Sequence, residues 1–294
     1  MITTSKKGEW YEIIIPQEWQ GLTVDYVFRT IWDSPKKLTH QFRMNKEVTI
    51  NGKPANWTEP LRKDDHLQIR LFSDVEFGVI PTYMELEVLY EDEHLLVVNK
   101  PAGINTHPNS PEESDSLANG VAFHLQANGE FRLVKHVHRL DRDTSGAILF
   151  AKHALVGSIL DKLLEERKIK RTYMALVNGK MKVKKGTIKE PIGRDRHHPT
   201  KRRVSPNGQP AVTHYEVIDV KKDISKIKCQ LDTGRTHQIR VHLSHIGHPI
   251  VGDKLYGENQ NGNKRLALHA EQLEFVHPLT LEKIHVHCRA GWEK

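Results

Sequence analysis

Side chains able to do acid–base or nucleophilic chemistry gather in the stretch His138-Arg139-Leu140-Asp141-Arg142-Asp143-Thr144-Ser145-Gly146. Asp141 has arginines at the second position before it and the first after it, and nearby positive charge favours an ionised carboxylate. If the stretch is extended, Arg139 and Asp141 point to the same side. The sequence therefore predicts that Asp141 is ionised. A turn rich in arginine and aspartate that neutralises its own charges is the alternative, and composition alone favours it.

Another polar motif is Thr233-Gly234-Arg235-Thr236-His237-Gln238-Ile239-Arg240-Val241-His242. It ends a predicted strand at Gly234 and opens a predicted helix over 236–246, closed by Gly247. The free amides and dipole at a helix start, with arginine beside them, suit an anion such as phosphate. Arg240 could also reach back to a carboxylate. A capped helix with a polar surface is an equally good interpretation of this pattern.

Metal and nucleotide motifs are missing from the sequence. The chain has 19 histidines, with His242, His245 and His248 spaced by three, but it has no HExxH, and its cysteines, Cys229 and Cys288, form no CxxC. Neither GxxxxGK[ST] nor GxGxxG occurs, and there is no GxSxG elbow. We expect no metal and no nucleotide or other small-molecule cofactor.

Positive charge is concentrated in one segment. The chain carries a formal charge of +7, while residues 167–203 hold 14 lysines and arginines against the acids Glu190 and Asp195. Such a segment suits the phosphate backbone of a nucleic acid, although a solubilising surface would have the same composition. The candidate backbone-binding residues are Arg194, Arg196, Lys201, Arg202 and Arg203.

Residues 10–75 are predicted to form a small N-terminal α/β domain, followed by a linker over 76–83 and a larger domain over 84–294. Apolar residues at helical spacing predict a helix over 22–31, and Ser34-Pro35 opens another over 36–44. Strands are expected over 48–50 and 67–72, with Asn51-Gly52 as a tight turn. The helix over 36–44 carries the basic residues Lys36, Lys37 and Arg43. They form either an RNA-binding face or a solvated helix surface.

The larger domain is predicted to be α+β. Strand patterns mostly follow one another directly, which favours a mixed, largely antiparallel central sheet with flanking helices. The expected strands are 86–90, 95–98, 147–151, 172–177, 212–220 and 227–231, and the clearest helix is 155–164. The polar amino terminus and the lack of a long apolar run favour a cytoplasmic protein without a membrane span.

Taken together, these segments resemble the RluA-type pseudouridine synthases. The stretch around Asp141 is similar to the family's catalytic block, and the stretch from Gly234 to His242 is similar to a later signature. Further matching segments are Val98-Asn99-Lys100-Pro101-Ala102-Gly103 with His107-Pro108, Lys170-Arg171-Thr172-Tyr173, Gly247-His248-Pro249-Ile250-Val251-Gly252-Asp253 and Tyr256-Gly257. The N-terminal domain resembles the small αL RNA-binding domain of a small-subunit ribosomal protein and of several RNA-modifying enzymes.

The resemblance implies that uridine in RNA is isomerised to pseudouridine without a cofactor. Asp141 would act as nucleophile at the sugar C1′ or as base toward a ribose proton, and Arg240 would pair with it. Tyr173 would stack on the uracil, and Arg139 would fill the gap left by an extruded nucleotide. Extrusion is also expected physically, because C1′ and both base edges cannot be reached inside a stacked helix. The other expected RNA- or substrate-binding residues are Lys100, His107, Arg235, His237 and Gln238.

Two other functions compete with this interpretation: a non-catalytic RNA-binding or ribosome assembly factor, and a metal-dependent hydrolase using the histidines. The front domain favours a large structured RNA, with large-subunit ribosomal RNA first and transfer RNA second. A monomer is expected to suffice, because one domain holds the proposed catalytic groups.

Overall fold

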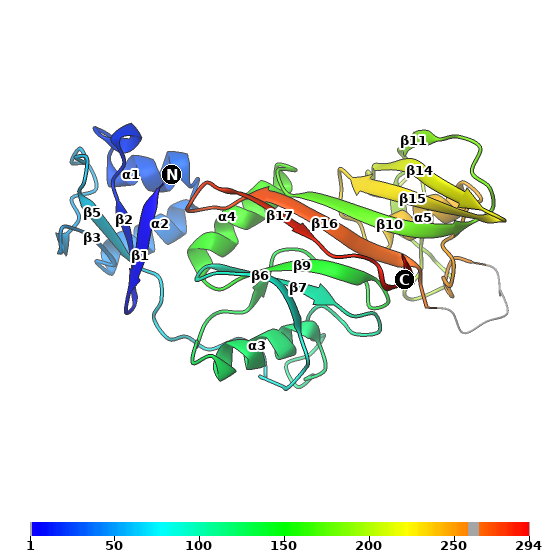
Figure 1. Ribbon diagram of the computed structural model, residues 1–294, viewed down its shortest axis with the longest axis horizontal. Coiled ribbons are helices and arrows are strands. Elements are labelled where there is room, and N and C mark those ends of the chain that lie inside the picture. Colours follow the sequence, from blue (N-terminus) through cyan, green and yellow to red (C-terminus); the bar gives the residue numbers. More distant parts are fainter. Residues whose placement is uncertain (1, 258–264, 294) are drawn as a thin grey trace.

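The computed structural model describes residues 2–257 and 265–293, and it shows a small N-terminal domain beside a larger one that contains a long sheet (Figure 1). Across this described part, no helix is long and apolar enough to cross a membrane. No group of three or more histidine, cysteine or acidic side chains there is arranged to hold a metal ion.

The N-terminal domain is a five-stranded sheet, in the order β1-β2-β5-β3-β4, covered by short helices. Its strands are β1 (Thr3–Lys7), β2 (Trp10–Ile14), β3 (Val48–Ile50), β4 (Lys53–Pro54) and β5 (His66–Arg70). The helix α2 (Lys36–Met44) has the predicted bounds, and both residues of the Asn51-Gly52 turn have positive φ, as a tight hairpin requires. The first predicted helix is divided into α1 (Val24–Tyr26) and the π-helical η2 (Val27–Ile31).

The larger domain contains a ten-stranded sheet whose main path runs β11-β14-β15-β10-β16-β9-β7-β6. Every strand pair in it is antiparallel except β9 with β16, so the predicted mixed, largely antiparallel sheet is confirmed. Its strands are β6 (Glu87–Glu91), β7 (Leu95–Lys100), β8 (Lys135–His136), β9 (Ser145–Ala151), β10 (Lys170–Asn178), β11 (Lys185–Ile188), β14 (Thr213–Lys221), β15 (Ile224–Leu231), β16 (Leu268–Val276) and β17 (Lys283–His287).

Helices cover both faces of this sheet. Alternate residues of β9 divide between two hydrophobic clusters: Leu149 packs with α4 (Ala154–Glu165), whereas Ile148 packs with α3 (Leu117–Ala127). The helix α5 (Gln238–His245) shares the cluster of Ile148 with β10 and β15. The sequence patterns predicted α4 and α5 but missed α3, whose start is a capping box of Ser116 and Asn119.

The parallel contact between β9 and β16 depends on a glycine. Gly146 has φ +119°, and a Cβ there would lie 2.3 Å from the backbone oxygen of Ala270. No other residue type fits without moving one of the two strands. This close approach fixes the loop before β9, which carries Asp141, against the strand β16.

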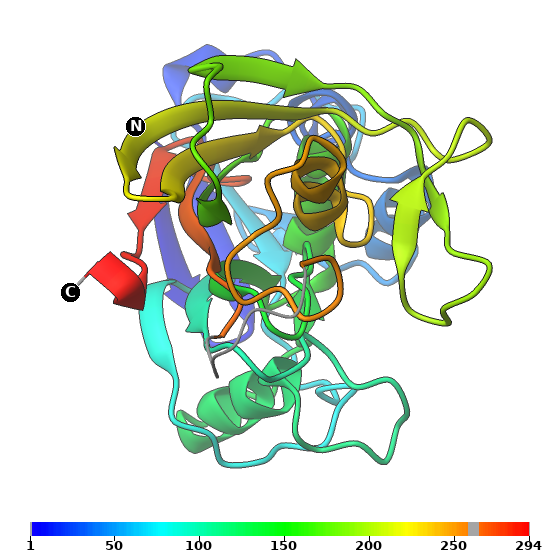
Figure 2. The same ribbon diagram turned by 90° about the vertical axis from the view of Figure 1, so that its right-hand side faces the viewer.

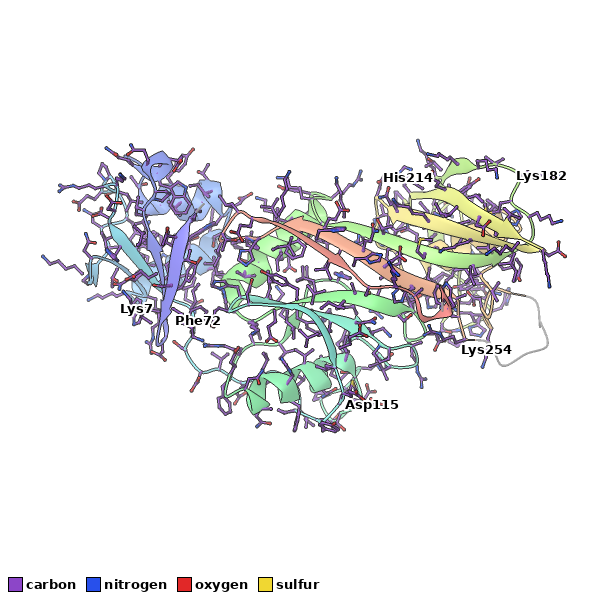
Figure 3. All side chains as sticks on the ribbon, in the orientation of Figure 1. Lys7, Phe72, Asp115, Lys182, His214 and Lys254 are labelled. Atoms are coloured by element: carbon purple, nitrogen blue, oxygen red, sulfur yellow. The ribbon has the colours of Figure 1, made fainter. Side chains whose placement is uncertain are left out.

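The segment that joins the two domains is packed against the larger one. Phe77, inside the predicted linker, is buried, and the backbone N–H of Thr82 donates to the carbonyl of Asn119 in α3 at 3.1 Å. Phe72 lies where the domains meet (Figure 3), with its ring 5.5 Å from that of His94. Lys6 also pairs with Glu93 across the junction at 2.6 Å.

Candidate active site

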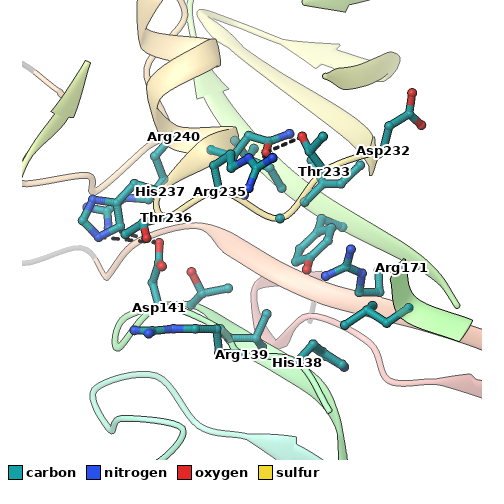
Figure 4. Close-up of a pocket in the computed structure, with 18 of the residues that line it drawn as sticks. His138, Arg139, Asp141, Arg171, Asp232, Thr233, Arg235, Thr236, His237 and Arg240 are labelled. Carbon is teal, nitrogen blue, oxygen red and sulfur yellow. Dashed lines mark hydrogen bonds and ion pairs between the residues drawn. The ribbon is translucent and has the colours of Figure 1, made fainter. Parts of the chain in front are cut away.

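A pocket of about 730 Å³ opens where several separate chain segments meet (Figure 4). Its walls come from the loop before β9, the end of α4, the starts of β10 and β16, the end of β15 and the first turn of α5. The predicted residues Arg139, Asp141, Tyr173, Arg235, His237, Gln238 and Arg240 all line it. Its size lies within the range of pockets that hold one small ligand.

Asp141 and Arg240, separated by 99 positions, meet in this pocket. The guanidinium Nη1 of Arg240 donates to Oδ2 of Asp141 at 3.4 Å. Arg240 makes its shorter bonds to Asp253, with Nε and Nη2 each 2.8 Å from a carboxylate oxygen. Such a two-pronged bond fixes the plane of the guanidinium. Arg240 is thereby held in position, with Nη1 directed at Asp141.

The Arg240–Asp253 pair is buried, because the two side chains are only 7% and 0% exposed. Burial alone would lower the pKa of Arg240, but the hydrogen bonds and charge of Asp253 outweigh it and raise the pKa above its ordinary value. Sequence patterns did not identify Asp253 as a residue of the site. The only signal was its place in the Gly252-Asp253 segment before Tyr256-Gly257.

The Asp141 loop is held in place by a buried threonine rather than by a neighbouring strand. The hydroxyl of Thr106 donates to the carbonyl of Leu140 at 3.0 Å and accepts from its N–H at 3.1 Å. Thr106 therefore replaces a strand neighbour for the residue before Asp141. Arg139 is exposed at the pocket, as a residue that contacts a large ligand must be.

Tyr173 lies on β10 at a register shift between Thr172 and Tyr173, which changes the pairing with β16. A bulge of this kind redirects side chains. The side chain is buried, and burial raises the pKa of the Tyr173 phenol, with the nearby Arg171 guanidinium opposing this in part. The phenol is therefore neutral at physiological pH and presents an apolar ring to the pocket.

Lys100 lies inside the domain instead of on an RNA-binding surface. It is fully buried, and its Nζ donates to the backbone carbonyls of Pro101, Ile104 and Arg142 at 2.8–2.9 Å. Burial lowers the pKa of this amine to about 8. Lys100 therefore supports the loop that follows Asp141, and the prediction that it contacts RNA is wrong.

We expect Lys100→Met to reduce the free energy of unfolding by about 1–3 kcal/mol, because buried carbonyls lose their donor. The loss should be largest above pH 8. The pKa of Lys100 is about 8 in the folded chain, against the ordinary value of 10.5 that applies in the unfolded chain. Between these two pH values the unfolded chain binds more protons, so raising the pH increases the free energy of unfolding of the wild type relative to that of the variant. Urea unfolding at pH 7 and pH 9.5 measures both effects. If wild type and Lys100→Met differed in free energy of unfolding no more at pH 9.5 than at pH 7, this role of Lys100 would be contradicted.

Two other residues predicted to bind RNA or substrate contact neighbouring residues of the protein instead. His107 lies outside the pocket lining, and its ring stacks on His136 with centroids 4.7 Å apart. Gln238 is buried, accepts from the Thr233 hydroxyl and the Arg235 N–H, and donates to Val212 and Thr213. These bonds make Gln238 a support for the start of α5.

The helix α5 begins two residues later than the sequence predicts. His237 precedes it in the left-handed conformation, with φ 59° and ψ 20°. This directs the His237 ring toward Asp141, with Nε2 3.9 Å from Oδ2 (Figure 4). Arg235 is exposed, and its Nε donates to the carbonyl of Pro210. Further along α5, both ring nitrogens of His242 have partners, Thr213 and the Glu190 carbonyl.

The basic segment folds in part as a two-stranded hairpin, β12 (Ile192–Arg194) with β13 (Arg202–Val204), set apart from the main sheet (Figure 2). Ile192 and Val204 pack against Val241 of α5, so the hairpin is anchored beside the pocket. Arg194, Arg196 and Arg203 are exposed, and Lys201 and Arg202 are half-buried.

The basic residues of α2 lie in the N-terminal domain, at the other end of the molecule from α5 (Figure 1). Lys36 and Lys37 are exposed. Arg43 pairs with Asp25 at 2.6 Å and lies over the ring of Trp57. Lys36 and Lys37 thus present the more accessible charge of the three.

The sequence model of the family described as RNA pseudouridylate synthase matches residues 94–245, which include Asp141, Tyr173 and Arg240. A further model, the N-terminal domain of the RluD ribosomal pseudouridine synthase, matches residues 11–67. The chain belongs to the RluA family of RNA pseudouridine synthases. It is thus an isomerase that acts on RNA, which removes the non-catalytic and hydrolase alternatives.

Relatives of this pseudouridine synthase match nearly its whole length. The uncharacterized RNA pseudouridine synthase YhcT of Bacillus subtilis is 47% identical, over 95% of this chain and 93% of the relative. The ribosomal large subunit pseudouridine synthase D of Xylella fastidiosa is 34% identical, over 90% of this chain and 84% of the relative. Among solved structures, human RNA pseudouridylate synthase domain containing 1 is similar, with a TM-score of 0.60 and 27% identity, covering 70% of this chain and 84% of that one.

Proposed function

We propose that this enzyme isomerises uridine in large-subunit ribosomal RNA, with Asp141 as the catalytic carboxylate. One observation carries the proposal: Asp141 faces a pocket of nucleotide size, opposite a guanidinium that a buried carboxylate holds in place. Relatives named as ribosomal large subunit synthases support ribosomal RNA as the substrate, and transfer RNA is the other candidate.

The target nucleotide leaves its stack and enters the pocket, where the apolar ring of Tyr173 packs on the uracil. Asp141 then acts in one of two ways. As a nucleophile it bonds to C1′ while the N1–C1′ bond breaks and its electrons pass to the uracil, and the Asp141–C1′ bond breaks again when C5 joins C1′. As a base it takes the C2′ proton while the N1–C1′ bond breaks, which leaves a C1′=C2′ double bond, and it returns that proton to C2′ when C5 joins C1′. In both routes the uracil turns before C5 bonds to C1′, the C5 proton is then lost to a base, and N1 takes up a proton. Arg139, at the mouth, fills the space that the nucleotide vacated.

The hairpin β12–β13 would bind the RNA backbone near the pocket. We expect the double change Lys201→Glu with Arg202→Glu to weaken RNA binding regardless of sequence. It should also reduce the slope of log K against log salt by about two, since each lost phosphate contact removes about one. Binding titrations at several salt concentrations measure this slope.

Lys221 and Lys222 provide the matched control, because their turn lies at the end of β14 and β15 away from the pocket. Lys221→Glu with Lys222→Glu alters the net charge equally and should leave the slope within about half a unit of wild type. An unchanged slope in the hairpin variant, or equal losses in the two variants, would remove the hairpin from the binding surface. The exposed Lys36 and Lys37 would provide another, more distant RNA contact.

The substrate can be tested with purified enzyme and unmodified transcripts that carry tritium at uridine C5. Isomerisation replaces this hydrogen, so tritium release follows the reaction. We expect release from large-subunit ribosomal RNA and much less from a transfer RNA pool. Faster release from transfer RNA would reverse the assignment of the substrate, and no release from either RNA would refute the proposed function.

A further inference from the structure

Tyr256 lies in a tight turn built on Asp253, the partner of Arg240. Oδ1 of Asp253 accepts from the backbone N–H groups of Leu255 and Tyr256 at 3.0 and 3.1 Å. The N–H of Gly257 donates to the Asp253 carbonyl, and a Cβ at Gly257 would lie 2.7 Å from that oxygen. The carboxylate that holds Arg240 therefore also fixes the backbone of Tyr256.

The ring of Tyr256 lies between the active site and the basic hairpin. The guanidinium carbon of Arg240 is 5.1 Å from the ring centroid, and Nζ of Lys201 is 5.5 Å from it. Both distances are within the range of cation–π attraction. These contacts restrict where the phenol oxygen can lie.

The phenol oxygen of Tyr256 has two partners at 2.8 Å, the backbone N–H of Arg202 and Nδ1 of His237. A backbone N–H only donates, so the oxygen accepts from Arg202 and its own proton is available to Nδ1. Burial raises the pKa of Tyr256 to about 12, so the phenol keeps that proton. Burial also lowers the pKa of His237, which keeps the imidazole neutral near pH 7.

A neutral imidazole that accepts at Nδ1 carries its proton on Nε2. Nε2 of His237 is the atom that faces Asp141, 3.9 Å from Oδ2. The same carboxylate oxygen accepts from Arg240. A small approach of the His237 ring would give Asp141 another donor, and such bonds commonly tighten when substrate binds.

We propose that Tyr256 is a positioning residue, which holds the His237 proton on Nε2 so that this donor faces Asp141 during uridine isomerisation. The inference rests on the proposed function, since it assumes that Asp141 does the chemistry. Arg202 donates to the phenol through its backbone N–H, and the charged groups around the pair are Asp141, Arg240, Asp253, Lys201 and the Arg202 guanidinium.

The test is Tyr256→Phe, which keeps the ring and removes only the hydroxyl. We expect the single-turnover rate with saturating enzyme to fall about 10-fold, the effect of one hydrogen bond to a charged group. RNA affinity should change less than about 2-fold, because no phosphate contact is lost. Tyr90→Phe is the matched control: it removes a phenol that bonds Asp92 at 2.9 Å outside the pocket lining, and its rate should equal that of wild type.

A double-mutant cycle separates positioning from general damage. His237→Asn removes the imidazole, and asparagine tolerates the left-handed backbone at this position. In that background, Tyr256→Phe should change the rate less than about 2-fold. Additive losses in an active enzyme would overturn the role of Tyr256 alone, whereas a wild type that forms no pseudouridine would overturn the proposed function.

A measurement without RNA completes the test. With ¹⁵N-histidine labelling, the His237 signals, assigned by their loss in His237→Asn, should show the proton on Nε2 in the wild type. They should show a mixture of tautomers in Tyr256→Phe. An unchanged tautomer in that variant would overturn the inference even if the rate falls.

Discussion

Asp141→Asn should lower the rate of pseudouridine formation by about 10⁴-fold, the upper range for loss of a general base or nucleophile. The amide has the shape of the carboxylate but can neither attack C1′ nor take a ribose proton. The fold and RNA affinity should be retained, because Asp141 lies at the open pocket and its bond to Arg240 is long, at 3.4 Å. Single-turnover kinetics and RNA titration measure the two properties separately.

Asp143→Asn is the matched control for this substitution. It makes the same chemical change two residues away, at an exposed position outside the pocket lining. We expect its rate to stay within about 3-fold of wild type, as for a change that touches no reacting group. If Asp141→Asn modified RNA at the wild-type rate, Asp141 would not be the catalytic carboxylate.

Arg240→Met should cause the largest loss of stability, about 3–5 kcal/mol, because it leaves the carboxylate of Asp253 buried without its partner. Methionine has a similar length and fills the same space. Activity should also fall strongly, since Asp141 loses its guanidinium neighbour. Urea unfolding and single-turnover kinetics give the two values.

The double variant Arg240→Met with Asp253→Asn separates these two effects. Asparagine removes the buried charge, yet its amide oxygen can still accept from the backbone N–H groups of Leu255 and Tyr256. We expect more than half of the lost stability to return while activity stays low. Recovery of activity together with stability would show that Arg240 serves only the fold.

The functional centre could be predicted from sequence where its residues lie in contiguous motifs. Asp141 and Arg240 each lie among polar residues with a recognisable order, and the structure brings them together in one pocket. The parts that sequence missed depend on burial. Lys100, Gln238 and Asp253 are polar in sequence, but each is enclosed and bonded to backbone or to a partner distant in sequence. Periodicity does not reveal such enclosure.

In the fold too, elements with local sequence signals could be predicted, whereas elements that depend on tertiary contacts could not. The helix over 36–44 was predicted to the residue, because the Ser34-Pro35 start is a local signal, although Pro35 rather than Ser34 is its N-cap. In contrast, β1 is short and polar, and it forms only by pairing with β2 at the edge of the sheet. The predicted linker over 76–83 is ordered because Phe77 is buried, an interaction the local composition does not show.

We propose that Asp141 of this enzyme carries the conversion of uridine to pseudouridine in large-subunit ribosomal RNA. The most direct test is to map pseudouridine in ribosomal RNA from cells lacking the protein, complemented with wild type or with Asp141→Asn. We predict that at least one large-subunit pseudouridine is lost without the protein, returns with the wild type and stays absent with the variant. An unchanged map in the deletion strain, or full restoration by Asp141→Asn, would contradict the account.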